Sequence, residues 1–217
     1  MDVGILGGTG PAGRGLAVRL AAAGLQVGMG SRDAARADAV AAEAVAPWPG
    51  RLAGSITGVD NPGAAAADLV VVATPWDSAV GTVRQLADPL AGKVVVSMVN
   101  ALVKEGREML ALVPPRGSMA AAIQAVLPRS KVAATFHHLP ASEMEDLDSG
   151  LLADVLVCAD DPAAREATLE LADRIEGLRP LDAGSLSQAA AIEAFTAVCI
   201  TLNIRHRVHS TLKLAGI

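Results

Sequence analysis

The sequence has no tyrosine, and aromatic residues make up only 2% of its 217 residues. A tyrosine therefore cannot be the acid that many ketone and imine reductases place beside their substrate. Lysine could replace it, but lysine occurs only at Lys93, Lys104, Lys131 and Lys213. Chemistry that depends on a tyrosine acid or base is excluded.

Cysteine and positive charge are also scarce. Cys158 and Cys199 have neither a metal-ligand spacing nor a disulfide framework, so we expect buried thiols in a reducing compartment. The net charge is −5 and the basic residues are scattered, which argues against a nucleic-acid partner. His206 and His209 are flanked by arginines, and no metal site is predicted there.

The sequence shows no targeting or membrane segment. Residues 1–6 run directly into a glycine loop without the basic region of a signal peptide. No window of membrane-spanning length is free of polar or charged residues. We therefore expect a cytoplasmic protein without a membrane partner.

Hydrophobic residues, many of them alanine, make up 52% of the chain, which is enough for a core. Strand-like and helix-like segments alternate along most of its length, and this order is typical of βαβ units with a parallel sheet. The predicted fold is a Rossmann-type, doubly wound α/β sheet. The predicted strands are 3–6, 26–30, 52–56, 68–73, 94–97, 132–135 and 154–158, and the predicted helices are 12–23, 33–45, 77–86, 118–127 and 162–175.

A glycine motif of the form G-x-G-x-x-G spans residues 8–13, between the first predicted strand and helix. In that context the motif predicts a dinucleotide site. Gly8 forms the tight turn, Gly10 lets the backbone approach a pyrophosphate, and Gly13 lets the helix pack on the strand. The helix N-terminus then binds the phosphates.

The end of the second predicted strand indicates which dinucleotide binds. NAD enzymes place an acid there, about 20 residues after the motif, to bind the ribose 2′-hydroxyl. This chain has Ser31 and Arg32 instead, and Arg36 follows one helical turn later. A guanidinium attracts a 2′-phosphate, so NADP is predicted. Asp33 is interpreted as a helix cap, although it could be a displaced NAD-type acid.

The other predicted strand ends carry Thr74, Asn100 and the segment 136–140. Few of these side chains ionise, and His137 is the only plausible proton carrier, with a structural or hydrogen-bonding histidine as the alternative. Hydride exchange between two flat redox cofactors requires orientation more than acid catalysis. A shallow, mostly apolar cleft suits a second flat cofactor.

A domain boundary is predicted at residues 141/142, giving an NADP-binding domain at 1–141 and a small C-terminal α/β domain at 142–217. Glu143, Glu145, Asp146 and Asp148 cluster beside this boundary and indicate a solvated loop, or else a metal or substrate site. The chain is predicted to end in one long or broken helix at 187–214. Its segment 189–202 is apolar on nearly every side, which predicts a homodimer.

Several strings together resemble the NADPH-dependent reductases of coenzyme F420, also called F420:NADP oxidoreductases, over nearly the whole chain. They are residues 7–10, 31–32, 74–76, 137–141 and, most specifically, 177–184. The resemblance implies hydride transfer between NADP(H) and the 5-deazaflavin of F420, a deazaflavin site between two domains, and dimers formed through C-terminal helices.

The resemblance also implies roles for individual residues, without a catalytic side chain beyond a possible contribution from His137. Phosphate and ribose contacts are implied at Thr9, Gly10, Pro11 and Ala12, and 2′-phosphate contacts at Ser31, Arg32 and Arg36. The nicotinamide side would involve Thr74, Ser78, Asn100, Ala141 and Leu212, and the deazaflavin would lie near His137, Leu139 and Pro140.

The predicted function is reversible hydride transfer between NADP(H) and F420 by a cytoplasmic, homodimeric oxidoreductase. Two alternatives remain open from the residues. One is an NADPH-dependent imine or carbonyl reductase, and the other is a non-catalytic NADPH sensor.

Overall fold

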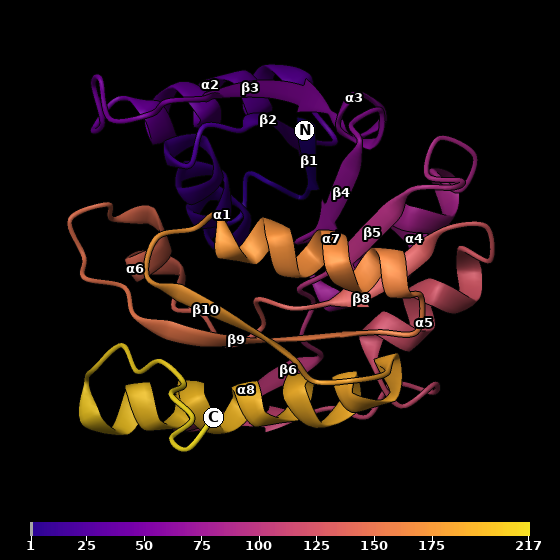
Figure 1. Cartoon of the computed structure of the whole chain (residues 1–217), viewed down its shortest axis with the longest axis vertical. Helices are drawn as coiled ribbons and strands as arrows, with labels where there is room; N and C mark the ends of the chain where they lie inside the picture. Colours follow the sequence, from indigo (N-terminus) through magenta and orange to yellow (C-terminus); the bar gives the residue numbers. More distant parts are fainter. Residues whose placement is uncertain (1) are drawn as a thin grey trace.

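A computed structural model describes residues 2–217 and shows a mostly parallel sheet with helices on both faces (Figure 1). The Rossmann-type fold is thereby confirmed. The elements are β1 (Asp2–Leu6), α1 (Pro11–Ala22), β2 (Gln26–Ser31), α2 (Ala34–Val45), β3 (Ser55–Asp60), α3 (Asn61–Ala65), β4 (Leu69–Val72), α4 (Trp76–Gln85), β5 (Val94–Ser97), β6 (Leu102–Glu105), β7 (Glu108–Ala111), α5 (Met119–Val126), β8 (Lys131–Ala134), α6 (Ala141–Glu145), β9 (Ala153–Ala159), α7 (Pro162–Asp173), β10 (Leu178–Asp182), η1 (Leu186–Gln188) and α8 (Ala189–His206).

The main sheet has eight strands in the order β10-β9-β8-β5-β4-β1-β2-β3. Its pairs are parallel except β8 with β9, which are antiparallel, with Ala133 opposite Ala159. The predicted parallel sheet is therefore confirmed apart from this one pair. The reason lies in α6, which packs against α1, so that the chain turns beyond the carboxyl end of β8 and returns along it.

Several segments differ from the sequence prediction. The third strand is β3 at Ser55–Asp60 rather than 52–56, because pairing with β2 fixes its register from Gln26 opposite Ser55. The last helix ends at His206 rather than near residue 214, because the next residue, Arg207, takes a left-handed conformation with φ 56°. The hairpin of β6 and β7, the strand β10 and the short helix α6 were not predicted from local patterns.

The core lies on both faces of the sheet. All four residues of β4 are buried, as a continuous apolar run predicts for a strand covered on both sides. Beyond the predicted boundary at 141/142 the sheet continues through β9 and β10. The division into two domains therefore remains a prediction.

Helix α8 lies along one edge of the fold and packs against β7, α5 and η1 (Figure 1). The stretch Leu186–His206 is long and apolar enough to cross a membrane by length and composition alone, although the sequence predicted no such window. The core helices of globular proteins pass the same test, so its composition supports no membrane assignment. The large apolar side chains that α8 exposes are Phe195, Val198 and Leu202.

Candidate functional site

A cleft of about 830 Å³ lies at the carboxyl ends of β1, β2 and β4. Ligands bind at this edge in open α/β sheets. The cleft brings together nine of the residues predicted from the sequence, which are Thr9, Gly10, Pro11, Ala12, Ser31, Arg32, Arg36, Thr74 and Ser78. It is also lined by residues that were not predicted, namely Gly7, Asn61, Ala73, Pro75, Asp77, Gly81, Thr82 and Gln85.

The glycine loop is compact enough to exclude other side chains. The Gly8 N–H donates hydrogen bonds to the carbonyls of Ile5 at 3.2 Å and Gly30 at 2.9 Å. A Cβ on Gly13 would lie 2.8 Å from the Cα of Gly8, closer than such atoms approach. The N-cap residue Gly10 offers no side chain to the first turn of α1, and that turn holds no acid. Its free N–H groups therefore favour an anion.

The end of β2 carries the predicted cations. Arg32 and Arg36 are exposed, and neither forms an ion pair anywhere in residues 2–217. The carboxylate of Asp33 accepts the N–H groups of Ala35 at 2.9 Å and Arg36 at 3.3 Å. Asp33 is therefore the cap of α2, as predicted. Two unpaired guanidinium groups at the rim of this cleft suit a phosphate.

Buried polar atoms without partners lie at the ends of three neighbouring strands. They are Oγ1 of Thr74 after β4, Oδ1 of Asn100 after β5, and both ring nitrogens of His137 after β8. The Nδ2 of Asn100 donates to the carbonyl of His137 at 2.9 Å and links the last two. A buried polar atom without a partner costs about 1–3 kcal/mol. This edge of the sheet therefore has hydrogen-bonding capacity that the protein itself does not use.

Asn61 belongs to the same pattern, because its buried Oδ1 also lacks a partner. It begins α3 directly after β3 and lies beside Gly30, where an added Cβ would come within 3.1 Å of that oxygen. Sequence reasoning missed Asn61 because it placed the third strand several residues too early. A correct end for β3 would have pointed to it.

His137 is 4% exposed, and burial, followed by the nearby His138, lowers its pKa to about 3. The imidazole is therefore neutral at physiological pH. His138 points elsewhere, with its Nε2 2.9 Å from the carbonyl oxygen of Asp154. Burial lowers the pKa of His138 as well. Neutral His137 can orient a ligand by hydrogen bonding but cannot supply a proton as an imidazolium.

The remaining predicted residues lie outside the lining of the cleft. His137, Leu139, Pro140 and Ala141 form what we call the 137–141 segment, which leads into α6. Asn100 touches this segment through the bond to His137. Leu212 lies in the C-terminal tail, where its carbonyl accepts the N–H of Asp154 at 2.8 Å.

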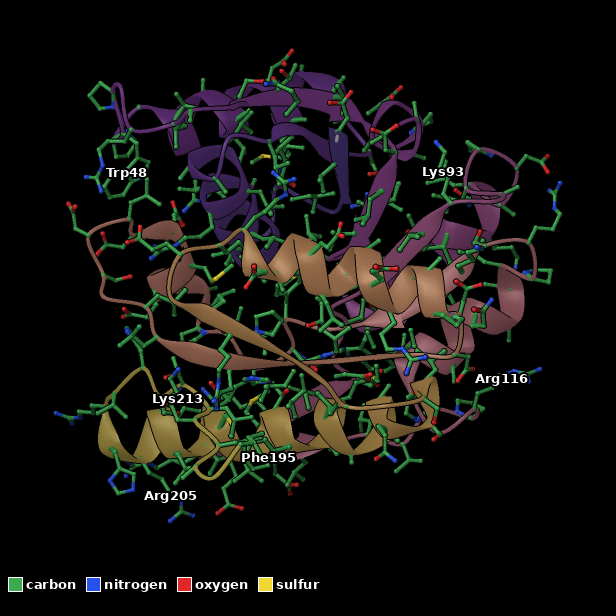
Figure 2. All side chains as sticks on the ribbon, in the orientation of Figure 1. Trp48, Lys93, Arg116, Phe195, Arg205 and Lys213 are labelled. Carbon is green, nitrogen blue, oxygen red and sulfur yellow. The ribbon has the colours of Figure 1, made fainter. Side chains whose placement is uncertain are left out.

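The string 177–184 forms β10 and fastens the C-terminal tail. Arg179 binds both carboxylate oxygens of the buried Asp154, at 2.9 and 2.7 Å, and also donates to the carbonyls of Leu214 and Ile217. Lys213, visible in the tail in Figure 2, adds a bond of 3.1 Å to Asp154. These hydrogen bonds, those from Arg179 first, lower the pKa of Asp154 well below its usual range. These bonds to Asp154 and from Arg179 fix the course of the C-terminal tail past Leu212.

No group of three or more His, Cys, Asp or Glu suited to a metal occurs within residues 2–217. The acidic cluster at 143–148 is instead bound by basic side chains. His209 lies 2.7 Å from Glu143, Arg14 pairs with Glu145 at 2.8 Å, and Arg51 pairs with Asp148 at 2.9 Å.

Comparison with known proteins matches residues 2–101 to the family of NADP oxidoreductases that are coenzyme F420-dependent. An F420-dependent NADP reductase of Methanocaldococcus jannaschii is 37% identical, with 97% of this chain and 96% of that protein covered. The protein of that name from Methanothermobacter thermautotrophicus is 36% identical, over 97% and 92%. A crystal structure from Arthrobacter sp. FB24, provisionally named an F420-dependent NADP reductase, superposes with a TM-score of 0.81, 28% identity and 99% coverage of both chains.

Proposed function

The chain belongs to the family of coenzyme F420-dependent NADP oxidoreductases, and from that premise we propose that it transfers a hydride reversibly between NADP(H) and F420. It is an oxidoreductase, like the relatives that match it from end to end. The observation that carries the proposal is the cleft itself, which has two unpaired arginines at its rim and the buried, unpartnered oxygens of Asn61 and Thr74 in its lining.

We propose that the dinucleotide lies along this edge of the sheet. The N–H groups of Ala12 and of the rest of the first turn of α1 would bind the pyrophosphate, with Thr9, Gly10 and Pro11 beside it. Ser31, Arg32 and Arg36 would hold the 2′-phosphate. Thr74, Ser78 and Asn100 would face the nicotinamide, and the unpartnered oxygens of Thr74 and Asn100 fit its carboxamide and ribose. Ala141 and Leu212 would complete that end.

The second coenzyme would lie against the 137–141 segment. Leu139 and Pro140 are half-buried and offer apolar surface, while the neutral ring of His137 offers one donor and one acceptor. This combination suits a flat heterocycle with polar edges.

When both are bound, NADPH donates a hydride, the deazaflavin accepts it, and one proton from solvent balances the reduction. The protein's contribution is orientation. The glycine loop fixes one end of the dinucleotide, Asn100 and Thr74 orient the other, and the 137–141 segment excludes water from the reacting face. Preorganisation of this kind can supply several kcal/mol of the barrier.

We also propose a cytoplasmic homodimer. Phe195, Val198 and Leu202 are 42%, 50% and 42% exposed on α8, and Phe195 can be seen on that helix in Figure 2. Apolar side chains at this spacing suit a two-fold contact between paired helices. Sedimentation of wild type and of a Val198→Glu variant tests it, and a wild-type monomer at micromolar concentration would contradict it.

The decisive experiment mixes the purified protein with NADPH and F420 and follows the visible absorbance of the deazaflavin. Bleaching is expected with NADPH and, much more weakly, with NADH. A protein that binds NADPH but leaves F420 unchanged from pH 5 to 9 would disprove the proposed function.

A further inference from the structure

Residues 143–149, which comprise the end of α6 and the turn after it and which we call the acidic loop, are held by a buried arginine of α1. Arg19 carries a charge and yet is only 6% exposed. Its Nε donates to the carbonyl of Met144 at 3.1 Å. Its Nη2 donates to the carbonyls of Glu143 at 2.7 Å and Asp146 at 2.5 Å, and to Oγ of Ser149 at 2.8 Å. One side chain therefore fixes four points of the loop.

These acceptors are neutral carbonyls and a hydroxyl, so their arrangement depends on backbone conformation rather than on charge. A guanidinium suits this task because its donors form a rigid planar fork. The carboxylates of the loop are used elsewhere, for example by Arg14 with Glu145. Arg19 therefore determines where the loop and the helix before it lie.

A second contact brings the same two elements together nearer the cleft. A Cβ on Gly15 would lie 2.7 Å from the Cβ of Met144 and 2.9 Å from the carbonyl oxygen of Ala141. Gly15 follows Ala12, which lines the cleft, by one helical turn, or about 4.5 Å along the axis. Figure 1 shows α6 beside α1. The glycine loop and the 137–141 segment are thus joined through less than two turns of α1.

We propose that Arg19 is a positioning residue for hydride transfer, which fixes the 137–141 segment relative to the glycine loop by clamping α6 onto α1. The inference rests on the proposed function, because it takes that segment as the wall of the second coenzyme. Arg19 itself touches neither coenzyme. It sets the separation between the part of the protein that holds NADPH and the part that holds its reaction partner.

Arg19→Lys tests this with little change in charge or volume. The variant keeps one cation but loses the fork, so the acidic loop should relax. Because a misplacement of about 1 Å can lower a rate by about a hundredfold, we expect kcat to fall about tenfold or more. The KM for NADPH should stay within about twofold, and the deuterium isotope effect with 4-deuterated NADPH should rise as the chemical step becomes slower. Asp148→Asn, which removes only the exposed pair with Arg51, is the matched control and should behave as wild type.

Gly15→Ala perturbs the contact between α1 and α6 while leaving Arg19 in place. Alanine favours the helix by up to about 1 kcal/mol, so α1 itself is not weakened. The added methyl must move α6, since Ala141 meets it with backbone. The same combination of lower kcat, unchanged NADPH KM and larger isotope effect is expected.

Hydrogen exchange of the NADPH-bound proteins gives a readout that does not depend on F420. Arg19→Lys should speed exchange in residues 141–149 and leave residues 10–14 protected. If the variant and wild type differ in this way but wild type never reduces F420, the proposed function fails while the clamp stands. Wild-type kcat in both variants, or parallel losses of kcat and NADPH affinity, would overturn the positioning role.

Discussion

The cleft and the 137–141 segment, which would face each other across the two coenzymes, are built in opposite ways. The cleft is open and charged, with Arg32 and Arg36 exposed at its rim. The segment is closed and nearly neutral, with His137 4% exposed and uncharged. The cleft depends on backbone N–H groups and on glycines that admit no Cβ, whereas the segment depends on the side chain of Asn100 after β5 and on the packing of α6 against α1. Substitutions in the first should therefore act on binding and substitutions in the second on the rate.

The largest effect is expected from Gly13→Val. The added side chain would meet Gly8, where even a Cβ comes within 2.8 Å of the Cα, and would open the loop that binds the pyrophosphate. NADPH affinity should fall by more than about a hundredfold, since several backbone bonds to a charged group are lost at about 1.5–3 kcal/mol each. Calorimetric titration measures the loss. Gly150→Ala, where an added Cβ meets nothing within 4 Å, is the matched control.

Arg32→Ala should come next. Losing one charge-assisted bond to phosphate costs about 1.5–3 kcal/mol, or about ten- to a hundredfold in NADPH affinity. NADH has no 2′-phosphate, so its weaker binding should hardly change. Fluorescence titration with both nucleotides separates the two results. Equal losses would mean that Arg32 does not recognise the 2′-phosphate.

His137→Ala should have a smaller effect, on the rate rather than on NADPH binding. A neutral imidazole that only orients a ligand contributes less than a general acid, whose help is worth about 10²–10⁴. We expect kcat to fall about tenfold. The pH profile from 5 to 9 should keep its shape, because the pKa of His137 lies near 3. Loss of an ionisation within that range on substitution would show instead that His137 transfers a proton.

The smallest effect on activity is expected at Glu193, which belongs to neither region. Glu193 lies on α8, is 4% exposed, and accepts the N–H groups of Met119 at 2.7 Å and Ala120 at 3.0 Å at the start of α5. Burial raises its pKa from 4.5 to about 7, although these bonds oppose the rise. As pH rises, Glu193 therefore loses its proton at a lower pH in the unfolded chain than in the folded protein. Because deprotonation favours the unfolded chain, the free energy of unfolding should fall between about pH 4.5 and 7.

Chemical denaturation of wild type and Glu193→Gln at pH 4.5 and 7 measures that contribution. The glutamine cannot ionise, so the decline with pH should be smaller in the variant, while kcat stays within about twofold of wild type. An equal decline in both proteins would assign the pH dependence to other groups.

The local sequence determined the half of the nucleotide cleft that residues 7–36 form. A strand, the three glycines of the motif and a helix lie within residues 2–22, and Ser31, Arg32, Asp33 and Arg36 follow at the end of the next strand and the start of α2. Each of these positions is fixed by contacts to near neighbours, such as the cap that Asp33 forms over Ala35. Patterns of this range are visible in a sequence, and the structure confirmed the strands, the first helix and the Asp33 cap. Asn61 escaped because its place depends on the register of β3 with β2.

The other half of the site was decided by the tertiary structure. Asn100 meets His137 across 37 residues, and Arg19 meets Met144 across 125. The antiparallel return of β9 and the clamp of α1 on α6 place the 137–141 segment, and neither leaves a period or a spacing in the sequence. The sequence named most of the side chains on that segment through a family resemblance, but their positions follow from buried contacts that form only when distant elements pack. Local hydrogen bonds thus set the binding half of this protein, and long-range burial sets the half that would face the second coenzyme.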